Sequence, residues 1–294
     1  MPGHSKLFAP DDYVDCAKKF RVQSLIGSGK YGEVWLCRDT TDNKLKAVKA
    51  ETHRDGSLER EIRIYQHLGS CKAAPTMLQF LTDGNPSWMV LTFEGESFGS
   101  IRSNYEDKCV PERRLLALTF HAVKAFKELH TLGIVHRDVR SANICLSRSS
   151  QKGRVIILDF GLSQKCLKPD GSRAYENDEP VNFSSVSLGS LNVMNGGQPK
   201  ELDDLHSFVY VMLHMRNAWF WHQSSREEIL QKKGELMKDV EGFLYEDEQF
   251  LVKPIQKILE QRYDRALPDY DDILATIRAI DGFDENAYTD ENLE

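Results

Sequence analysis

The pattern of apolar and polar positions predicts strands in the first part of the chain. Short apolar stretches over 21–36 and 44–50 are separated by Gly, Asp and Asn, as expected for neighbouring antiparallel strands. A further strand is expected over 88–93, and the Glu94-Gly95 pair after it has the character of a hinge. The run over 155–158 is short and continuously apolar, which is typical of a buried strand.

Two stretches instead show the three- and four-residue spacing of a helix with one apolar face. In the first, over 57–68, the spaced residues are Leu58, Ile62, Tyr65 and Leu68. The second begins at Pro111 and ends before Gly133, and its spaced residues are Leu115, Leu118, Ala122, Phe126 and Leu129. The remainder, from Leu202 onward, is predicted to be mostly helical.

This order of elements predicts an α+β fold with two unequal lobes. The small N-terminal lobe is rich in strands and carries one helix, and the larger C-terminal lobe is mainly helical. We expect an N-terminal extension over 1–15, a domain over 16–283 and an acidic, solvated tail over 284–294. The lobes are expected to span about 16–94 and 95–283.

Composition and charge restrict the class of protein. With 294 residues and 40% hydrophobic content, the chain can bury one large core or two adjoining ones. Its formal net charge of −7 argues against nucleic acid or an anionic membrane as the main partner. The six cysteines are scattered without a C-x-x-C pair, and the longest apolar run, Phe208 to Leu213, is too short to cross a bilayer. We therefore expect a monomeric cytoplasmic or nuclear protein.

The first candidate for chemistry is the glycine-rich stretch Gly27-Ser28-Gly29-Lys30-Tyr31-Gly32, between two predicted strands. Glycines let backbone N–H groups close over phosphates, and Val34 is placed to cover an adenine ring. The position between strands disfavours a dinucleotide-binding motif, in which such glycines open a helix. On its own the motif is weak, and a structural β-turn is the alternative.

The next strand carries Lys49 between apolar neighbours, where a lysine needs an anionic partner. Glu61 in the following helix is one candidate for that partner, and Glu59 is a rival that the sequence leaves open. A surface lysine with its amine in solvent is the alternative interpretation.

The third candidate is His136-Arg137-Asp138, with Asn143 five residues beyond the acid and Asp159-Phe160-Gly161 after the next strand. Phosphoryl transfer needs a carboxylate near the acceptor hydroxyl and oxygen ligands for Mg²⁺. Asp138, Asn143 and Asp159 provide these groups. Each motif alone could be a charged turn or a strand end, but their order along the chain makes coincidence an unlikely explanation.

With these motifs, the chain resembles a eukaryotic protein kinase over about residues 16 to 280. Within that superfamily it looks like the casein kinase 1 group, nearest the tau-tubulin kinase-like, nematode-type branch. The supporting stretches are LKAVKAE at 45–51, EREIRIYQHLG at 59–69, DFGLS at 159–163 and QRYDRALPDYDDIL at 261–274.

The resemblance implies the bilobal protein kinase fold, ATP and Mg²⁺ as cofactors, a protein substrate and serine/threonine kinase activity. The residues that it places around ATP are Ile26, Gly27, Gly29, Gly32, Val34, Ala47, Lys49, Glu61, Leu91, Thr92, Phe93 and Glu94. Among them Leu91 corresponds to the gatekeeper, and 92–94 to the hinge that contacts adenine.

The resemblance also implies catalytic roles. Lys49 would hold the α and β phosphates and Glu61 would orient Lys49, while Asp138 would accept the proton of the substrate hydroxyl. The residues implied as magnesium ligands are Asn143 and Asp159. Asp204 matches the buried acid that braces the catalytic loop from a later helix.

Arg140 departs from this pattern, because serine/threonine kinases usually carry lysine two residues after the catalytic acid. Arginine is longer, planar and forked, so the exchange is not conservative. We expect Arg140 to meet the γ-phosphate with altered geometry. Since some tyrosine kinases carry H-R-D-x-R-x-A-N, tyrosine or dual specificity is an alternative.

A second departure lies in the stretch SSVSLGSLN at 184–192, which aligns with the group's G-T-x-R-Y-A-S-I-N. Ser185 replaces a threonine and keeps its hydroxyl. Ser187 replaces an arginine that binds an anionic group of the substrate, so a preference for acidic substrates is not expected. A flexible loop or autophosphorylation sites are further interpretations. Together with Arg140, this stretch leaves a nucleotide-binding pseudokinase that acts as a scaffold as an alternative function.

Overall fold

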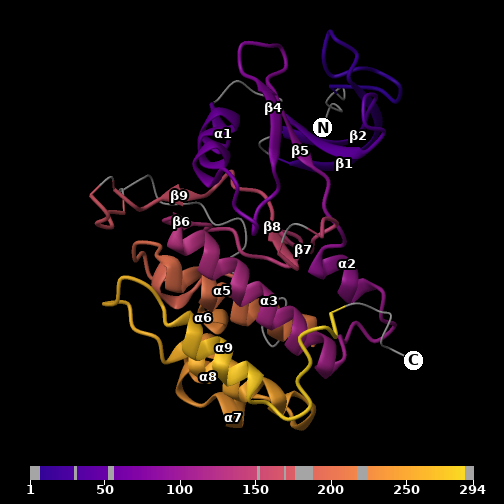
Figure 1. The fold of residues 1–294 in the computed structure, drawn as a ribbon. Coiled ribbons are helices and arrows are strands. Elements are labelled where there is room, and N and C mark those ends of the chain that lie inside the picture. Colours follow the sequence, from indigo (N-terminus) through magenta and orange to yellow (C-terminus); the bar gives the residue numbers. More distant parts are fainter. Residues whose placement is uncertain are drawn as a thin grey trace.

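The computed structural model of this chain describes residues 7–29, 32–51, 56–150, 153–168, 170–175, 188–216 and 224–288. Figure 1 shows a strand-rich part formed by the first third of the chain and a larger part made mainly of helices. This arrangement confirms the predicted α+β fold with a small β-rich lobe and a larger helical lobe.

The small lobe contains a five-stranded antiparallel sheet with the strand order β1-β2-β3-β5-β4. Its strands are β1 (Phe20–Gly29), β2 (Gly32–Asp39), β3 (Leu45–Ala50), β4 (Met77–Leu81) and β5 (Trp88–Thr92). The antiparallel strands predicted from the apolar pattern are confirmed. The edge strand β4 was not predicted, because most of its side chains are exposed and the alternation of buried and exposed positions is missing.

Successive side chains of the sheet point to opposite faces. One face is closed by a buried cluster that includes Trp35 and Val90, with Leu7 and Phe8 packed against it. The rings of Phe8 and Trp35 meet edge-on, with centroids 5.8 Å apart. The described part of the N-terminal extension, 7–15, is thus held against this face of the sheet, and the opposite face is turned toward the large lobe.

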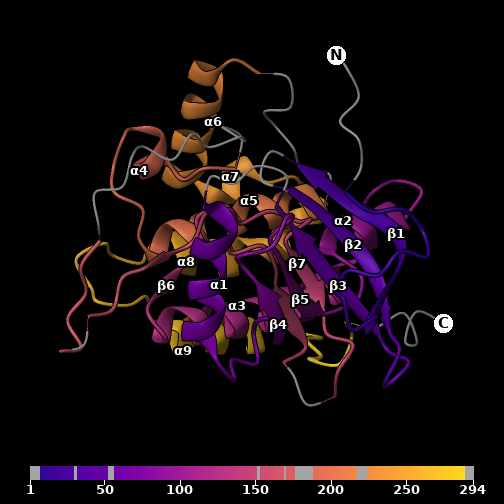
Figure 2. The same cartoon turned by 90° about the horizontal axis from the view of Figure 1, so that it is seen from above.

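The described part of the small lobe has one helix, α1 (Ser57–Leu68), and its bounds agree with the prediction. Its buried residues include the predicted Leu58, Ile62, Tyr65 and Leu68. Figure 2, viewed from above, shows α1 beside the sheet and over the helices of the large lobe. Helix α1 is therefore placed to bring side chains of its buried face to the junction of the lobes.

The large lobe is built around α3 (Glu112–Thr131), which begins after Pro111 and ends before Gly133, as predicted. The other helices are α2 (Phe98–Ser103), α4 (Leu191–Met194), α5 (Glu201–Met215), α6 (Arg226–Lys238), α7 (Val240–Phe243), α8 (Val252–Leu259) and α9 (Tyr270–Arg278), with a 3₁₀ helix at Glu246–Leu251. Helices α5 and α9 pack against α3, and α8 packs against both of them. They surround one continuous apolar core.

Two short antiparallel pairs lie between the sheet and these helices (Figure 1). Strand β6 (Ile134–Val135) pairs with β9 (Gln164–Lys165), and β7 (Ile144–Leu146) pairs with β8 (Val155–Ile157). Of these only β8 was predicted, because strands of two or three residues show no period. The segment between β6 and β7 holds the His-Arg-Asp motif, and the Asp-Phe-Gly motif follows β8.

The acidic tail expected from residue 284 is not fully solvated over 284–288, although Glu285 and Asn286 in it are exposed. Ala287 is only 6% exposed. The backbone oxygen of Glu285 lies 2.8 Å from Nε2 of His121 in α3, and the ring of Tyr288 packs edge-on against the same histidine. The acidic composition did not predict this packing, because only the interspersed apolar residues Ala287 and Tyr288 make it.

All six cysteines of the chain are free thiols. Among the helices in the described ranges, none combines the length and the apolar character needed to cross a membrane.

Candidate active site

The two lobes are joined by a three-membered ionic cluster. Lys49 in β3 donates to Glu61 Oε2 in α1 at 2.6 Å and to Asp159 Oδ1, just after β8, at 2.8 Å. Burial by itself lowers the pKa of Lys49, but the two carboxylates outweigh this effect and raise the pKa well above its usual value. Lys49 therefore carries its charge at any physiological pH. The sequence prediction that an anion compensates this lysine is met by two carboxylates.

Glu61, and not its rival Glu59, is the partner in α1. Glu61 is 2% exposed, whereas Glu59 points to solvent and lies 3.8 Å from Arg63 on the helix surface. The second oxygen of Glu61, Oε1, accepts a hydrogen bond from the backbone N–H of Phe160 at 3.2 Å. The apolar spacing contained this answer, since Glu61 lies three residues after Leu58 and so shares its face.

The catalytic loop between β6 and β7 brings together the acid and the amide of the predicted motif. Asn143 Nδ2 donates to the Asp138 backbone oxygen at 2.9 Å and to its Oδ2 at 2.8 Å. Arg140 Nε lies 3.3 Å from the same carboxylate oxygen. Burial raises the pKa of Asp138 above its usual value, and the charge of Arg140 opposes that rise. The loop thus presents an oriented carboxylate with an elevated pKa.

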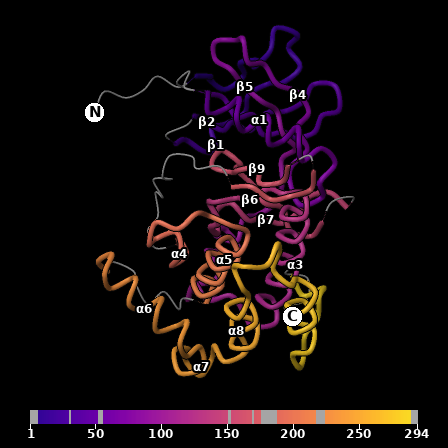
Figure 3. Tube along the Cα trace, turned by 90° about the vertical axis from the view of Figure 1, so that its left-hand side faces the viewer, coloured from indigo at the N-terminus to yellow at the C-terminus, as the bar shows by residue number. Residues whose placement is uncertain are grey.

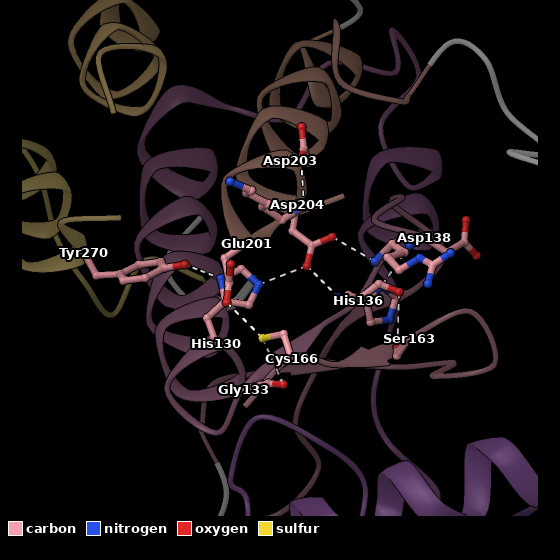
Figure 4. A network of polar contacts seen from close by, with 12 residues as sticks. His130, Gly133, His136, Asp138, Ser163, Cys166, Glu201, Asp203, Asp204 and Tyr270 are labelled. Carbon is pink, nitrogen blue, oxygen red and sulfur yellow. Dashed lines mark hydrogen bonds and ion pairs between the residues drawn. The ribbon is translucent and has the colours of Figure 1, made fainter. Parts of the chain in front are cut away.

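Asp204 in α5 braces the loop through its carboxylate (Figure 4). Its two carboxylate oxygens accept hydrogen bonds from the backbone N–H groups of His136, at 2.6 Å, and of Arg137, at 2.9 Å. His130 Nε2 in α3 lies 2.9 Å from Asp204 Oδ2, and its Nδ1 bonds to the Tyr270 hydroxyl. Although burial raises it, these contacts hold the pKa of Asp204 below its usual value. The predicted bracing contact is present, and sequence reasoning missed His130 and Tyr270.

Three aromatic rings in edge-to-face contact connect α1 to the catalytic loop. The Phe160 ring meets those of Tyr65 and His136 edge-on, at centroid distances of 5.2 and 5.3 Å. His136 Nε2 donates to the backbone oxygen of Leu158 at 2.9 Å, and its Nδ1 accepts from the backbone N–H of Asp138 at 3.3 Å. These ring contacts keep α1, and with it Glu61, close to the loop. The signal for Tyr65 is its place four residues after Glu61 on the same helix face.

A second polar cluster secures the stretch after β9. Glu201 in α5 forms an ion pair with Arg173 and accepts from the Tyr175 hydroxyl at 2.7 Å. Cys166 Sγ lies 3.1 Å from Glu201 Oε1 and 3.2 Å from the backbone oxygen of Gly133 (Figure 4). Burial raises the pKa of Cys166 to about 12, so this thiol serves as a hydrogen-bond donor and not as a nucleophile.

The residues implied for the adenine lie on the face of the sheet that carries Lys49. In the strand register Val34 stands opposite both Gly27 and Lys49, and Ala47 stands opposite Leu91. Paired residues of antiparallel strands share a face. These side chains therefore form an apolar surface around the ammonium group of Lys49, opposite the Trp35 cluster.

The hinge segment is tied to the large lobe through its own side chains. Thr92 donates its hydroxyl to Glu94 Oε1 at 2.6 Å, and the backbone N–H of Arg148 donates to Glu94 Oε2 at 3.2 Å. The guanidinium of Arg148 also lies over the Phe93 ring, 5.3 Å from its centroid. Leu91, at the implied gatekeeper position, is 8% exposed at the end of β5.

The glycines of the first motif play unequal structural parts. A Cβ on Gly32 would lie 2.2 Å from the backbone oxygen of Ala50, and its φ of 148° is itself unfavourable for other residues. A Cβ on Gly29 would meet nothing within 4 Å, and one on Gly27 would make only ordinary contacts. Ile26 beside them is 47% exposed. Among these three glycines, the described structure requires only Gly32 for steric reasons.

Some predicted features lie outside the described residues. These are Lys30 and Tyr31 in the glycine-rich motif, and Ser185 and Ser187 in the altered stretch.

A family model described as the protein kinase domain matches residues 20–186. The match covers more than half of the 294 residues, so the chain belongs to the protein kinase family. The matched segment carries the glycine-rich motif, Lys49, Glu61, the catalytic loop and Asp159. Protein kinase domains generally use ATP and Mg²⁺ and act on proteins.

The donor set at the junction of the lobes fits a magnesium ion. Asn143 uses its Nδ2 toward Asp138, which turns its Oδ1 away from that residue. Asp159, with a side chain 40% exposed, adds a carboxylate, and such hard oxygen ligands suit Mg²⁺. Within the residues that the structure describes, no group of three or more His, Cys, Asp or Glu forms an alternative metal site.

Proposed function

We propose that this chain is a serine/threonine protein kinase that transfers the γ-phosphate of Mg-ATP to a hydroxyl group of a protein substrate. The observation that carries the proposal is the contact of Lys49 with both Glu61 and Asp159. It joins the glycine-rich sheet to the segment after β8, whose strand partner β7 follows the loop that holds Asp138 and Asn143. A phosphate-binding cation, an oriented acid and two magnesium ligands are thus held by one framework.

In this proposal the sheet binds the nucleotide. Val34, Ala47 and Leu91 contact the adenine, together with Ile26 and the hinge at 92–94. Backbone N–H groups near Gly27, Gly29 and Gly32 lie over the phosphates, and Lys49 neutralises the α and β phosphates. Glu61 keeps the Lys49 ammonium in place, since its other oxygen is fixed by the backbone of Phe160.

Asn143 and Asp159 hold magnesium, which neutralises phosphate charge when it is bound. Asp138 orients the acceptor hydroxyl and takes its proton as the new bond from the hydroxyl oxygen to the γ-phosphorus forms. The bond to the bridging oxygen of ATP breaks, and ADP leaves with that electron pair. The hydrogen bond from Asn143 Nδ2 to Asp138 Oδ2 fixes the direction of the Asp138 carboxylate.

Arg140 is proposed to meet the γ-phosphate in place of the usual lysine. Its contact with Asp138 holds the guanidinium beside the position of the acceptor hydroxyl. The same contact favours the second candidate, a nucleotide-binding pseudokinase, because a catalytic acid occupied by arginine is less available to a substrate. Tyrosine or dual specificity is a further variant of the kinase proposal.

The finer assignments follow from the resemblance stated above. We assign the chain to the casein kinase 1 group, nearest the tau-tubulin kinase-like branch, and propose a catalytic domain over 16–283 in a cytoplasmic or nuclear monomer. The packing of 7–15 and of 284–288 on this domain suggests that both stretches belong to its stable folded unit.

The test is transfer of label from γ-labelled ATP to a mixed peptide set, with Asp138→Asn as the matched control. We expect the substitution to lower kcat by about 10²–10⁴-fold, the usual contribution of a positioned acid–base group. Phosphoamino-acid analysis of the product should give phosphoserine or phosphothreonine. Transfer by the wild type that does not exceed that of Asp138→Asn, with nucleotide binding intact, would establish the pseudokinase instead.

A further inference from the structure

The stretch 7–14, which we call the strap, contacts both β1 and β2, and the proposed mechanism does not use it. Its backbone pairs with the first part of β1, where the Asp11 N–H donates to the Val22 oxygen at 2.9 Å and the Val22 N–H donates to the Asp12 oxygen at 2.8 Å. Strand β1 is the last strand on one side of the sheet, so the strap covers this edge. Figure 3 shows β1 and β2 side by side in the small lobe.

The beginning of the strap is fixed at Glu33, the residue that follows Gly32. Glu33 Oε2 accepts hydrogen bonds from the Leu7 backbone N–H at 3.0 Å and from Trp35 Nε1 at 3.1 Å. Glu33 is 5% exposed, and a carboxylate buried to this extent requires such donors. The Phe8 ring adds its edge-on contact with the Trp35 ring. The strap is thus held by a polar and an apolar contact with the same strand, β2.

The strap and the proposed nucleotide site lie on opposite faces of β2. Successive side chains of a strand point to opposite faces, and both residues that contact the strap, Glu33 and Trp35, lie on one of them. Val34 stands between these two in the sequence and opposite Lys49 in the strand register, so it shares the face of that lysine. Three consecutive residues therefore connect the strap to the nucleotide face.

We propose that docking of the strap and binding of the nucleotide are coupled through β2, which makes the strap a regulator of the nucleotide site. The inference rests on the proposed function. The docked strap limits the motion of the β1–β2 hairpin from one face, and a nucleotide limits the same motion from the other. Each event therefore lowers the entropic cost of the other. Because the coupling is a free energy shared by two binding equilibria, it acts equally in both directions.

Amide hydrogen exchange of the full wild-type chain, with and without saturating Mg-ADP, tests the coupling. We expect the Leu7 amide, which is bonded to Glu33, to exchange about fivefold more slowly with the nucleotide, at the low end of the usual coupling between two sites. Direct contact does not explain such protection, because the strap lies on the opposite face of β2. The amides of α8 in the large lobe are the control and should exchange at the same rate in both samples.

The reverse direction is tested with Phe8→Ala, which loosens the strap and leaves every residue of the proposed nucleotide site in place. Its Kd for Mg-ADP should rise by up to the same fivefold, since the loss cannot exceed the coupling. The matched control is Phe80→Ala in β4, whose ring is 41% exposed, and its Kd should equal that of the wild type.

The outcomes separate the coupling from the function on which it rests. A wild-type chain that binds no Mg-ADP would refute the proposed nucleotide site itself. Nucleotide binding that leaves the exchange of the Leu7 amide unchanged would overturn the coupling alone. A lower melting temperature of Phe8→Ala with an unchanged Kd would also overturn it, because the strap would then serve stability only.

Discussion

Asp138 lies under two opposing influences that come from neighbouring groups. Burial disfavours its charged form, and the guanidinium of Arg140, 3.3 Å from Oδ2, favours it. The protonation of the proposed catalytic acid therefore depends on Arg140 as well as on the folded environment. This dependence links the unusual arginine to the pH response of the enzyme.

We predict that Arg140→Ala raises the pKa of Asp138, because the opposing positive charge is removed while burial stays. The acidic limb of the kcat/KM profile should then move to higher pH. Arg140→Lys retains a positive charge and should keep the limb closer to its wild-type position. The measurement is kcat/KM against pH for the three proteins, and superimposable acidic limbs for Arg140→Ala and the wild type would contradict this link.

At the scale of elements, the hairpin of β1 and β2 depends on a close backbone approach to β3. Gly32 begins β2 where the Ala50 carbonyl leaves no space for a Cβ, whereas Gly29 at the end of β1 is open. The fold requires a glycine at position 32, whereas only the proposed ATP binding gives a reason for a glycine at position 29. Substitutions at the two glycines therefore separate an effect on protein stability from an effect on ATP binding.

Gly32→Ala should lower the free energy of unfolding by about 1–3 kcal/mol, the cost of a residue forced into a disfavoured backbone conformation. Gly29→Ala should keep wild-type stability and instead raise the KM for ATP, because its methyl group enters the proposed phosphate space. Denaturant unfolding and ATP kinetics on both variants check this. Equal stability of the two variants would show that the strand can shift away from Ala50.

Elements differed in how well the sequence predicted them, and length is the reason. Helices α1 and α3 are long enough for their apolar spacing to identify a buried face, and their predicted bounds were close to those observed. Strands β6 and β9 have two residues each, so no alternation can be read from them. They exist because the segments around the catalytic loop are brought side by side by tertiary packing.

At the scale of the whole molecule, both flanking stretches pack against the lobe on which they lie. Leu7 and Phe8 pack against the core of the sheet, and the Tyr288 ring packs against His121 in α3. There the ring of Tyr288 also lies under the guanidinium of Arg154, 5.2 Å away, at the start of β8. The C-terminal stretch thus connects α3 to the hairpin that precedes Asp159.

Deletion of 284–294 should destabilise the protein by about 1–3 kcal/mol, since it removes the buried Ala287 and the packed Tyr288 side chain. For a domain of this size each kcal/mol corresponds to a fall of about 2–4 °C in the melting temperature. Deletion of 289–294 alone is the control and should leave the melting temperature unchanged. Equal melting temperatures for the two truncations would show that residues 284–288 do not stabilise the fold, as expected for a solvated tail.

The sequence by itself determined the protein kinase family, the two-lobed fold and the short-range contact of Asp138 with Asn143. Asp138 and Asn143 are five residues apart, so a single loop suffices to bring them into contact. The tertiary structure decided the contact of Lys49 with Asp159, which are 110 residues apart. It also decided the packing of the C-terminal stretch against α3. Local patterns encode which face of an element is buried, but contacts between distant segments depend on how those faces pack together, and this is settled only by the folded chain.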